Sequence, residues 1–126
     1  AAFIREFFDL MAAQKTDFTL TFRHLAKGPD AFLALFKDGP PAQEWLARWQ
    51  ALGTADTALM DSMNPAFIPR NHRIEEVIEA AKKGEFKPFH ELHQILSLPY
   101  EEQPEFEKYS RPPKPEEVVC NTFCGT

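Results

Sequence analysis

Apolar side chains recur at intervals of three and four residues along most of this chain, and this helical period constrains its fold more than any other feature. The opening stretch AAFIREFFDLM shows it, because Phe3, Ile4, Phe7, Phe8 and Met11 fall on one face of a helix. No segment alternates convincingly between apolar and polar residues, apart from a weak EEVVCNTF near the end. The sequence therefore predicts an all-α fold, an irregular set of about seven short helices.

Glycine and proline mark the ends of these predicted helices. Gly28, Gly53 and Gly84 each follow an apolar stripe, as helix-ending glycines do. Thr16 or Asp17 is placed to cap the second helix, and Lys87-Pro88 opens the last one. The stripes that we expect to face a core contain Phe18, Phe22 and Leu25; Phe32, Leu35 and Phe36; Trp45, Leu46, Trp49 and Leu52; Leu59, Met60 and Met63; Ile74, Val77, Ile78 and Ala81; and Phe89, Leu92, Ile95 and Leu96.

Composition narrows the class of protein. The net charge of −5 argues against general attraction to nucleic acid or anionic lipid, and opposes a DNA-binding helix-turn-helix. The sequence contains no run of about 18 apolar residues, so it predicts no membrane span. Two cysteines cannot form a disulfide framework, so we expect a reducing, cytoplasmic location. The first residues lack an initiator Met and a signal-peptide pattern, which suggests a piece of a longer protein.

A change in composition at Pro99 divides the chain into two predicted parts. Residues 1–98 form a helical subdomain, and residues 99–126 form an extended strap rich in Pro and Glu that ends in Cys-x-x-x-Cys. Five of the 11 prolines fall in the strap. Aromatic and β-branched residues also punctuate it, which favours a strap packed on the helices over a free tail.

The strap holds both cysteines, Cys120 and Cys124. In extended chain they would lie about 13 Å apart, too far for a mutual disulfide. Two interpretations remain open. Either Cys124 is an exposed thiol that pairs with a cysteine outside this chain, or both thiols are inert, with Cys120 buried and Cys124 merely exposed.

Three small polar clusters are candidate binding sites, each with a structural alternative. In HELH, His90 and His93 could share a metal, but their spacing misses the metalloprotease pattern and suits a solvated helix face. In FRHLAK, Arg23 and His24 could flank a phosphate. PRNHR places residues 70–73 where a helix begins, a natural anion site. Alternatively, Asn71 is the helix cap and the arginines pair with nearby Glu side chains.

No catalytic constellation is recognisable. The five glycines are isolated, so no phosphate cradle exists, and none of the serines lies in a G-x-S-x-G turn. We assign no catalytic, cofactor-binding or metal-binding residue, and we predict that the isolated chain is inactive.

Three stretches together resemble a known family. DFTLTFRHL (residues 17–25), MNPAFIPRNHRIEEVIEAAKKGEF (residues 63–86) and YSRPPKPEEVVCNTFCGT (residues 109–126) resemble, in this order, the C-terminal part of the selenoprotein O family. The resemblance implies a longer protein with a protein-kinase-like fold, an adenylyltransferase that moves AMP from ATP to Ser, Thr or Tyr hydroxyls of protein substrates with Mg²⁺ or Mn²⁺. It also implies that the catalytic residues lie in an upstream lobe against which these helices pack.

Only one functional position of the family transfers to this chain. Cys124 matches the selenocysteine or cysteine near the family's C-terminus, which is linked to redox control through a bond to an upstream cysteine that this chain lacks. No role follows for Cys120. The alternative reading is a non-catalytic helical protein-interaction module with a thiol-bearing tail. EAAKKGEFKPFHELHQIL does resemble an ankyrin-type helix pair, but no repeat of about 33 residues supports an array.

Overall fold

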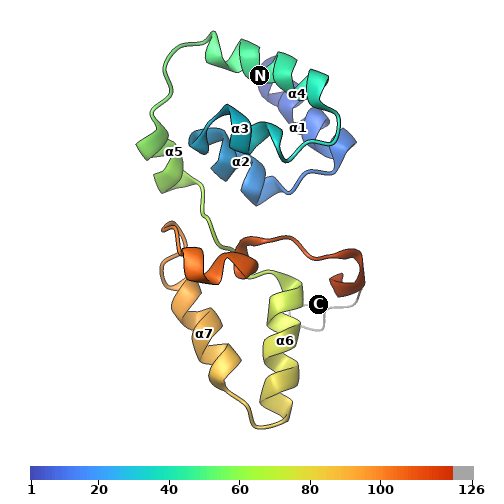
Figure 1. Cartoon of the computed structure of the whole chain (residues 1–126), viewed down its shortest axis with the longest axis vertical. Helices are drawn as coiled ribbons and strands as arrows, with labels where there is room; N and C mark the ends of the chain where they lie inside the picture. The colour runs from blue at the N-terminus through green and yellow to red at the C-terminus, as the bar shows by residue number, and fades with distance from the viewer. Residues whose placement is uncertain (121–126) are drawn as a thin grey trace. The chain divides into compact units, whose positions relative to one another are not determined.

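The computed structural model describes residues 1–120. All regular secondary structure in these residues is helical (Figure 1). No strand occurs within these residues, so the predicted all-α class is confirmed. The helices are α1 (Ala2–Gln14), α2 (Phe18–Lys27), α3 (Pro29–Leu33), α4 (Gly39–Gln50), α5 (Thr57–Met63), α6 (Asn71–Lys82) and α7 (Lys87–Leu96), followed by the 3₁₀ helices η1 (Pro104–Ser110) and η2 (Pro115–Glu117).

The chain forms two compact units. The first comprises Ala1–Pro65 and the second begins at Ala66. The predicted boundary between residues 1–98 and 99–126 rests on composition, whereas these two units are defined by contacts. That boundary therefore stays a prediction. None of the helices within residues 1–120 combines the length and the apolar composition that crossing a bilayer requires.

The core of the first unit is built around aromatic rings. The Trp45 ring stacks on Phe7, with the two ring centroids 4.0 Å apart, and on Phe3 at 4.9 Å. Phe32 is completely buried beside them. The buried core residues of this unit are Phe7, Met11, Leu25, Phe32, Phe36, Ala42, Trp45 and Leu46.

Local signals set several helix ends of this unit, and those at Asp17 and Gly28 agree with the predictions from the sequence. The Asp17 carboxylate accepts a hydrogen bond of 2.9 Å from the Leu20 amide and caps α2. Asp56 caps α5 in the same way through the Leu59 amide. Gly28, with a φ of +132°, joins α2 to α3 in a conformation that disfavours other residues.

Several predicted stripes are partly exposed, which corrects the expectation that whole stripes face the core. Leu52 lies beyond the end of α4 and is 75% exposed, and Trp49 is only half-buried. Short helices with few neighbours can cover only part of a wide apolar face. The other exposed residues of these stripes are Ile4, Phe8, Phe18, Leu59, Met63 and Phe89.

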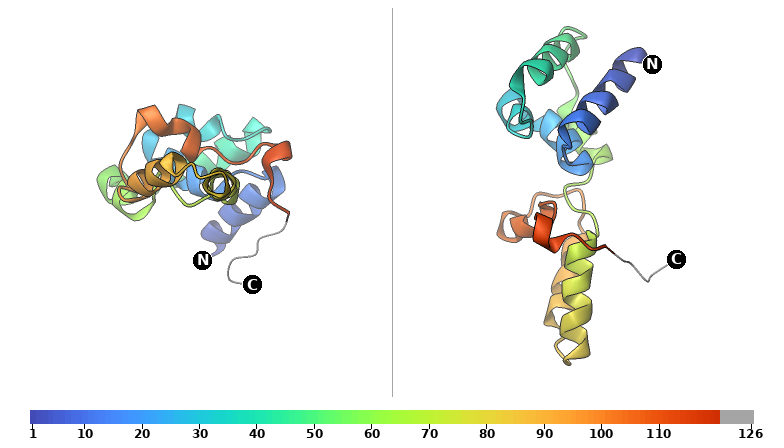
Figure 2. Two further views of the ribbon diagram at one scale, coloured as in Figure 1. Left: turned by 90° about the horizontal axis from the view of Figure 1, so that it is seen from below. Right: turned by 90° about the vertical axis from the view of Figure 1, so that its right-hand side faces the viewer.

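In the second unit α6 and α7 form a helical hairpin, and Figure 1 and Figure 2 show the short turn that joins them. At the turn, Gly84 takes a φ of +81° and the Glu85 amide donates to the Ala80 carbonyl oxygen at 2.9 Å. After α7 the chain returns, and the Pro99 carbonyl oxygen accepts from the amides of Ala66 and Phe67. The buried core residues are Ala66, Phe67, Leu92, Ile95 and Tyr109.

Candidate functional site: the anchored strap

The strap is fixed to the hairpin by Tyr109, which η1 directs into the core of the second unit. The Tyr109 hydroxyl donates a hydrogen bond of 2.5 Å to the Glu91 carboxylate on α7. Burial, together with this hydrogen bond, raises the pKa of Tyr109 to about 12. Tyr109 therefore stays protonated and donates to Glu91 throughout the physiological pH range.

Cations from two elements lie over the face of the Tyr109 ring. The Arg73 guanidinium carbon is 5.6 Å from the ring centroid, and the Lys108 ammonium nitrogen is 4.9 Å from it. Both distances allow cation–π attraction, which is stronger where the ring is shielded from water. The ring thus links α6 to the strap as well as filling the core.

Arginines at the start of α6 bind the strap backbone. Arg70 Nη2 donates to the Ser110 carbonyl oxygen at 2.9 Å, and Arg73 Nη2 donates to that of Lys108 at 3.2 Å. Arg73 Nη1 also pairs with the Glu76 carboxylate at 2.8 Å. Arg70 occupies the N-cap position of α6, and its side chain makes no capping hydrogen bond. The prediction that Asn71 is the cap is therefore wrong. The predicted pairing of an arginine with Glu is found at Arg73.

His72 lies beneath the strap and is 4% exposed, and neither ring nitrogen has a hydrogen-bond partner. It borders two cavities of about 270 and 300 Å³ whose walls include Val119 of the strap. Burial lowers the pKa of His72, and the neighbouring Arg73 and Arg70 lower it further, whereas Glu117 and Glu76 oppose them. His72 is therefore neutral at pH 7.

We expect the second unit to lose stability as the pH falls, through His72. Below its ordinary pKa of about 6.5, the histidine binds a proton in the unfolded chain but not in the folded one, so the free energy of unfolding falls by up to about 1.4 kcal/mol per pH unit. Urea unfolding followed by circular dichroism between about pH 7 and pH 5.5 measures this slope. His72→Gln should flatten it. An equal slope in the variant would show that His72 is not the group responsible.

The remaining predicted residues lie apart from this junction. Cys124 lies outside the described residues. Cys120 is exposed, so the alternative that has it buried is wrong. His90 and His93 are exposed on α7 beside the Phe89 ring.

The basic cluster of the first unit serves its fold. Arg23 is buried, and its Nη1 donates to the carbonyl oxygens of Asp61 and Asn64, each at 2.9 Å, tying α2 to the end of α5. His24 Nδ1 lies 3.2 Å from the Ala31 carbonyl oxygen. The structure thus gives both side chains partners within their own unit.

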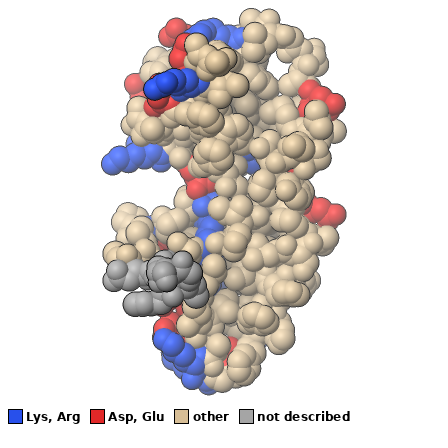
Figure 3. Space-filling view, turned by 180° about the vertical axis from the view of Figure 1, so that it is seen from behind, with Lys and Arg blue, Asp and Glu red and all other residues tan. Residues whose placement is uncertain are grey.

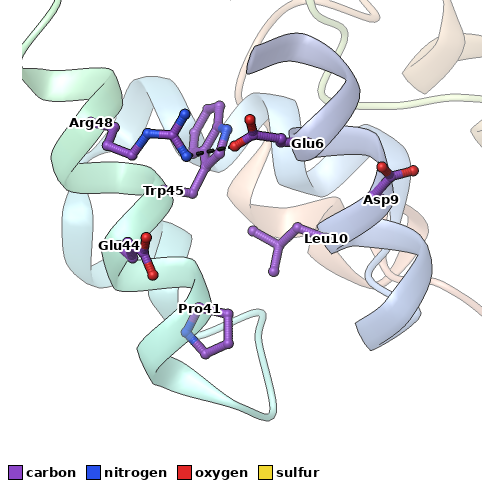
Figure 4. Close-up of a pocket in the computed structure, with 7 residues that line it drawn as sticks. All are labelled: Glu6, Asp9, Leu10, Pro41, Glu44, Trp45 and Arg48. Atoms are coloured by element: carbon purple, nitrogen blue, oxygen red, sulfur yellow. Dashed lines mark hydrogen bonds and ion pairs between the residues drawn. The ribbon is translucent and has the colours of Figure 1, made fainter. Parts of the chain in front are cut away.

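A further hollow, of about 280 Å³, lies between α1 and α4 in the first unit (Figure 4). Its walls carry Glu6, Asp9 and Glu44, and Figure 4 shows that Arg48 reaches across to Glu6. That ion pair measures 2.5 Å and holds the pKa of Glu6 below its usual value. Within residues 1–120 no group of three His, Cys, Asp or Glu side chains is arranged to hold a metal.

On the face drawn in Figure 3, the Lys and Arg side chains of the described residues are scattered and form no continuous basic area. The strap junction instead brings charged side chains of α6, α7 and η1 together around Tyr109.

Sequence reasoning missed how this site is assembled. Glu91 lies in the HELH stretch, whose histidines were the candidate ligands. No sequence pattern around Glu91 links it to Tyr109, 18 residues away. One signal pointed to these residues. Tyr109 begins the third stretch that resembles the family, and Arg70 and Arg73 lie in the second.

Comparison with known proteins gives this arrangement a context. No family model matches the chain. Three curated relatives are all named protein nucleotidyltransferase YdiU: one from Bradyrhizobium sp. (strain BTAi1) is 50% identical over 94% of this chain, one from Rhizobium etli (strain CFN 42) 48% over 93%, and one from Rhodopseudomonas palustris (strain BisB5) 44% over 97%.

The all-helical chain with its anchored strap thus aligns with one stretch of relatives that are named nucleotidyltransferases. It belongs to the selenoprotein O family, the protein nucleotidyltransferases YdiU, and matches a C-terminal portion of that family. The chain spans about a quarter of the length of these relatives, 27% of the Bradyrhizobium sp. (strain BTAi1) protein and 26% of the R. etli (strain CFN 42) protein.

Proposed function

We propose that the whole protein is a cytoplasmic protein adenylyltransferase that moves AMP from ATP to Ser, Thr or Tyr hydroxyls of other proteins with Mg²⁺ or Mn²⁺. This chain is its C-terminal helical part, which supports an upstream kinase-like catalytic lobe. The observation that carries the proposal is an identity of 44–50% to proteins named nucleotidyltransferases, across more than nine-tenths of the chain.

The strap gives this part a second role, as the carrier of a redox-control thiol at Cys124. Tyr109 fixes the strap 15 residues before that cysteine (124 − 109). The anchored segment thus sets the point from which Cys124 reaches a cysteine elsewhere in the whole protein. Loss of two electrons and two protons to a peroxide-type oxidant would join the two sulfurs and restrain the tail.

The isolated chain should not transfer AMP, because it contains no phosphate cradle. The active counterpart is a chimaera in which the matching stretch of the Bradyrhizobium sp. (strain BTAi1) relative is replaced by this chain. Both are incubated with labelled ATP, Mn²⁺ and acceptor proteins. We expect label on the acceptors only with the chimaera. Incorporation by the isolated chain above a control without it would contradict the assignment of catalysis to the missing part.

Cys124 should react readily with an alkylating reagent in the native isolated chain, and it should form no bond with Cys120. The β-branched residues of VVCNTF favour extended backbone, in which the two sulfurs lie too far apart to bond. Thiol counting under mild oxidant, followed by mass spectrometry, tests both statements. Cys120→Ser is the matched control, because it should leave the alkylation rate of Cys124 unchanged. Full protection of Cys124, or an intramolecular Cys120–Cys124 disulfide, would contradict the prediction.

A further inference from the structure

Three apolar side chains on α1 and α2 form a continuous surface of the first unit, which we call the aromatic face: Ile4, Phe8 and Phe18. They are 57%, 45% and 62% exposed, respectively. The rings of Phe8 and Phe18 stack with their centroids 6.2 Å apart, and Ile4 lies one helical turn from Phe8. Half-buried Phe22 supports both rings from below, at 6.4 and 4.9 Å, and joins the face to the core through Phe7.

The packing of the first unit leaves much of the aromatic face exposed to solvent. At the exposures above, the two rings and Ile4 present roughly 300 Å² of apolar surface, since each aromatic side chain offers about 150–250 Å² in all. Soluble monomers seldom expose apolar patches larger than a few hundred Å², and the largest patch of a protein is often functional. The core beneath is complete without these atoms, because Phe7 and Phe32 are already buried.

The size of the face also indicates its occupant. A stable dimer of two free chains buries about 800 Å² on each partner, well above what this face supplies. A neighbour in the same polypeptide needs much less area, because the connection holds it at an effective concentration of about millimolar. The relatives contain almost three-quarters of their length outside the matched stretch, so such a neighbour exists in each of them.

We infer that the aromatic face is the surface on which the rest of the longer polypeptide packs. The inference rests on the proposed function only in treating this chain as part of a longer protein. It assigns Phe8 and Phe18 as the central contacts and Ile4 as their flank. The rings are exposed in this chain alone and are covered in the whole protein.

Hydroxyl-radical labelling read by mass spectrometry tests this on the isolated chain and on the Bradyrhizobium chimaera described above. We expect labelling of Phe8 and Phe18 to fall about fivefold or more in the chimaera, because residues at the centre of an interface are shielded from solvent. Fully buried Phe32 gives the background in both proteins. Equal labelling of the two rings in both proteins would overturn the inference. So would protection in the isolated chain that grows with its concentration, which would identify a second copy as the occupant.

A pair of variants gives an independent readout. Phe8→Ala with Phe18→Ala should lower the Tm of the chimaera by about 5 °C or more beyond its effect on the isolated chain, because an interface is lost only there. Leu52→Ala with Leu59→Ala, at exposed positions of the same unit, is the matched control and should affect both proteins equally. An equal effect of the Phe pair in both proteins would overturn the inference. Neither readout uses AMP transfer, so a protected but inactive chimaera would reject the proposed function and keep this surface.

Discussion

Trp45→Ala is expected to lower the free energy of unfolding of the first unit by about 3–5 kcal/mol, the range for removing a buried Trp from a core. Trp45 is 6% exposed and its ring is in contact with those of Phe3, Phe7 and Phe32. A unit of this size has a total stability of the order of 3–10 kcal/mol, so the variant should be largely unfolded or close to it. Trp49 is the only other tryptophan, and its fluorescence during urea unfolding reports on this unit alone.

Leu52→Ala is the matched control for this experiment. Helical spacing places Leu52 on the same stripe as Trp45, yet the side chain is 75% exposed. Its truncation should change the free energy of unfolding by no more than about 0.5 kcal/mol. A loss below about 1 kcal/mol for Trp45→Ala, or a comparable loss for Leu52→Ala, would contradict the packing described for this unit.

Tyr109→Ala is expected to release the strap and to lower the free energy of unfolding of the second unit by about 3 kcal/mol or more, close to the cost of truncating a buried aromatic. The variant loses the hydrogen bond to Glu91, the contact with Phe106 and the attraction of two cations. Trypsin cleavage after Lys108 measures the release, because the other basic residues of the strap, Arg111 and Lys114, precede prolines that trypsin does not accept. We expect cleavage to accelerate about a hundredfold.

Tyr109→Phe separates the hydroxyl from the ring. This variant keeps the buried ring and loses only the hydrogen bond to a carboxylate, so a smaller loss of about 1.5–3 kcal/mol is expected. The cleavage rate should lie between those of the unsubstituted chain and Tyr109→Ala. Cleavage of Tyr109→Ala at the unsubstituted rate would show that Tyr109 does not hold the strap.

Helical period and helix-end signals were sufficient to predict the fold class and several boundaries. Asp17 caps its helix as the sequence suggests, and the α6–α7 hairpin turns at Gly84. What periodicity could not decide is which part of an apolar stripe is covered. Phe7 and Phe8 are adjacent in one stripe, but only Phe7 meets Trp45, because coverage depends on where the neighbouring helices lie.

The strap junction was less predictable, for a different reason. Residues 70–73 looked like an anion site because basic side chains gather where a helix begins, and that pattern is the same whether the partner is a ligand or a carbonyl oxygen. In the structure, Arg70 and Arg73 bind carbonyl oxygens of the strap, 35 to 40 residues further along the chain. Contacts between such distant segments leave no local signal in the sequence.

We propose that the whole protein transfers the adenylyl group, rather than the terminal phosphoryl group, of ATP. The most direct measurement incubates the Bradyrhizobium chimaera with acceptor proteins and Mn²⁺, in parallel with ATP labelled at the α- or the γ-phosphorus. Attack of an acceptor hydroxyl on the α-phosphorus leaves AMP on the protein and releases pyrophosphate. We expect that only the α-label is incorporated, on Ser, Thr or Tyr. Incorporation of the γ-label alone, or of neither label by a folded chimaera, would contradict it.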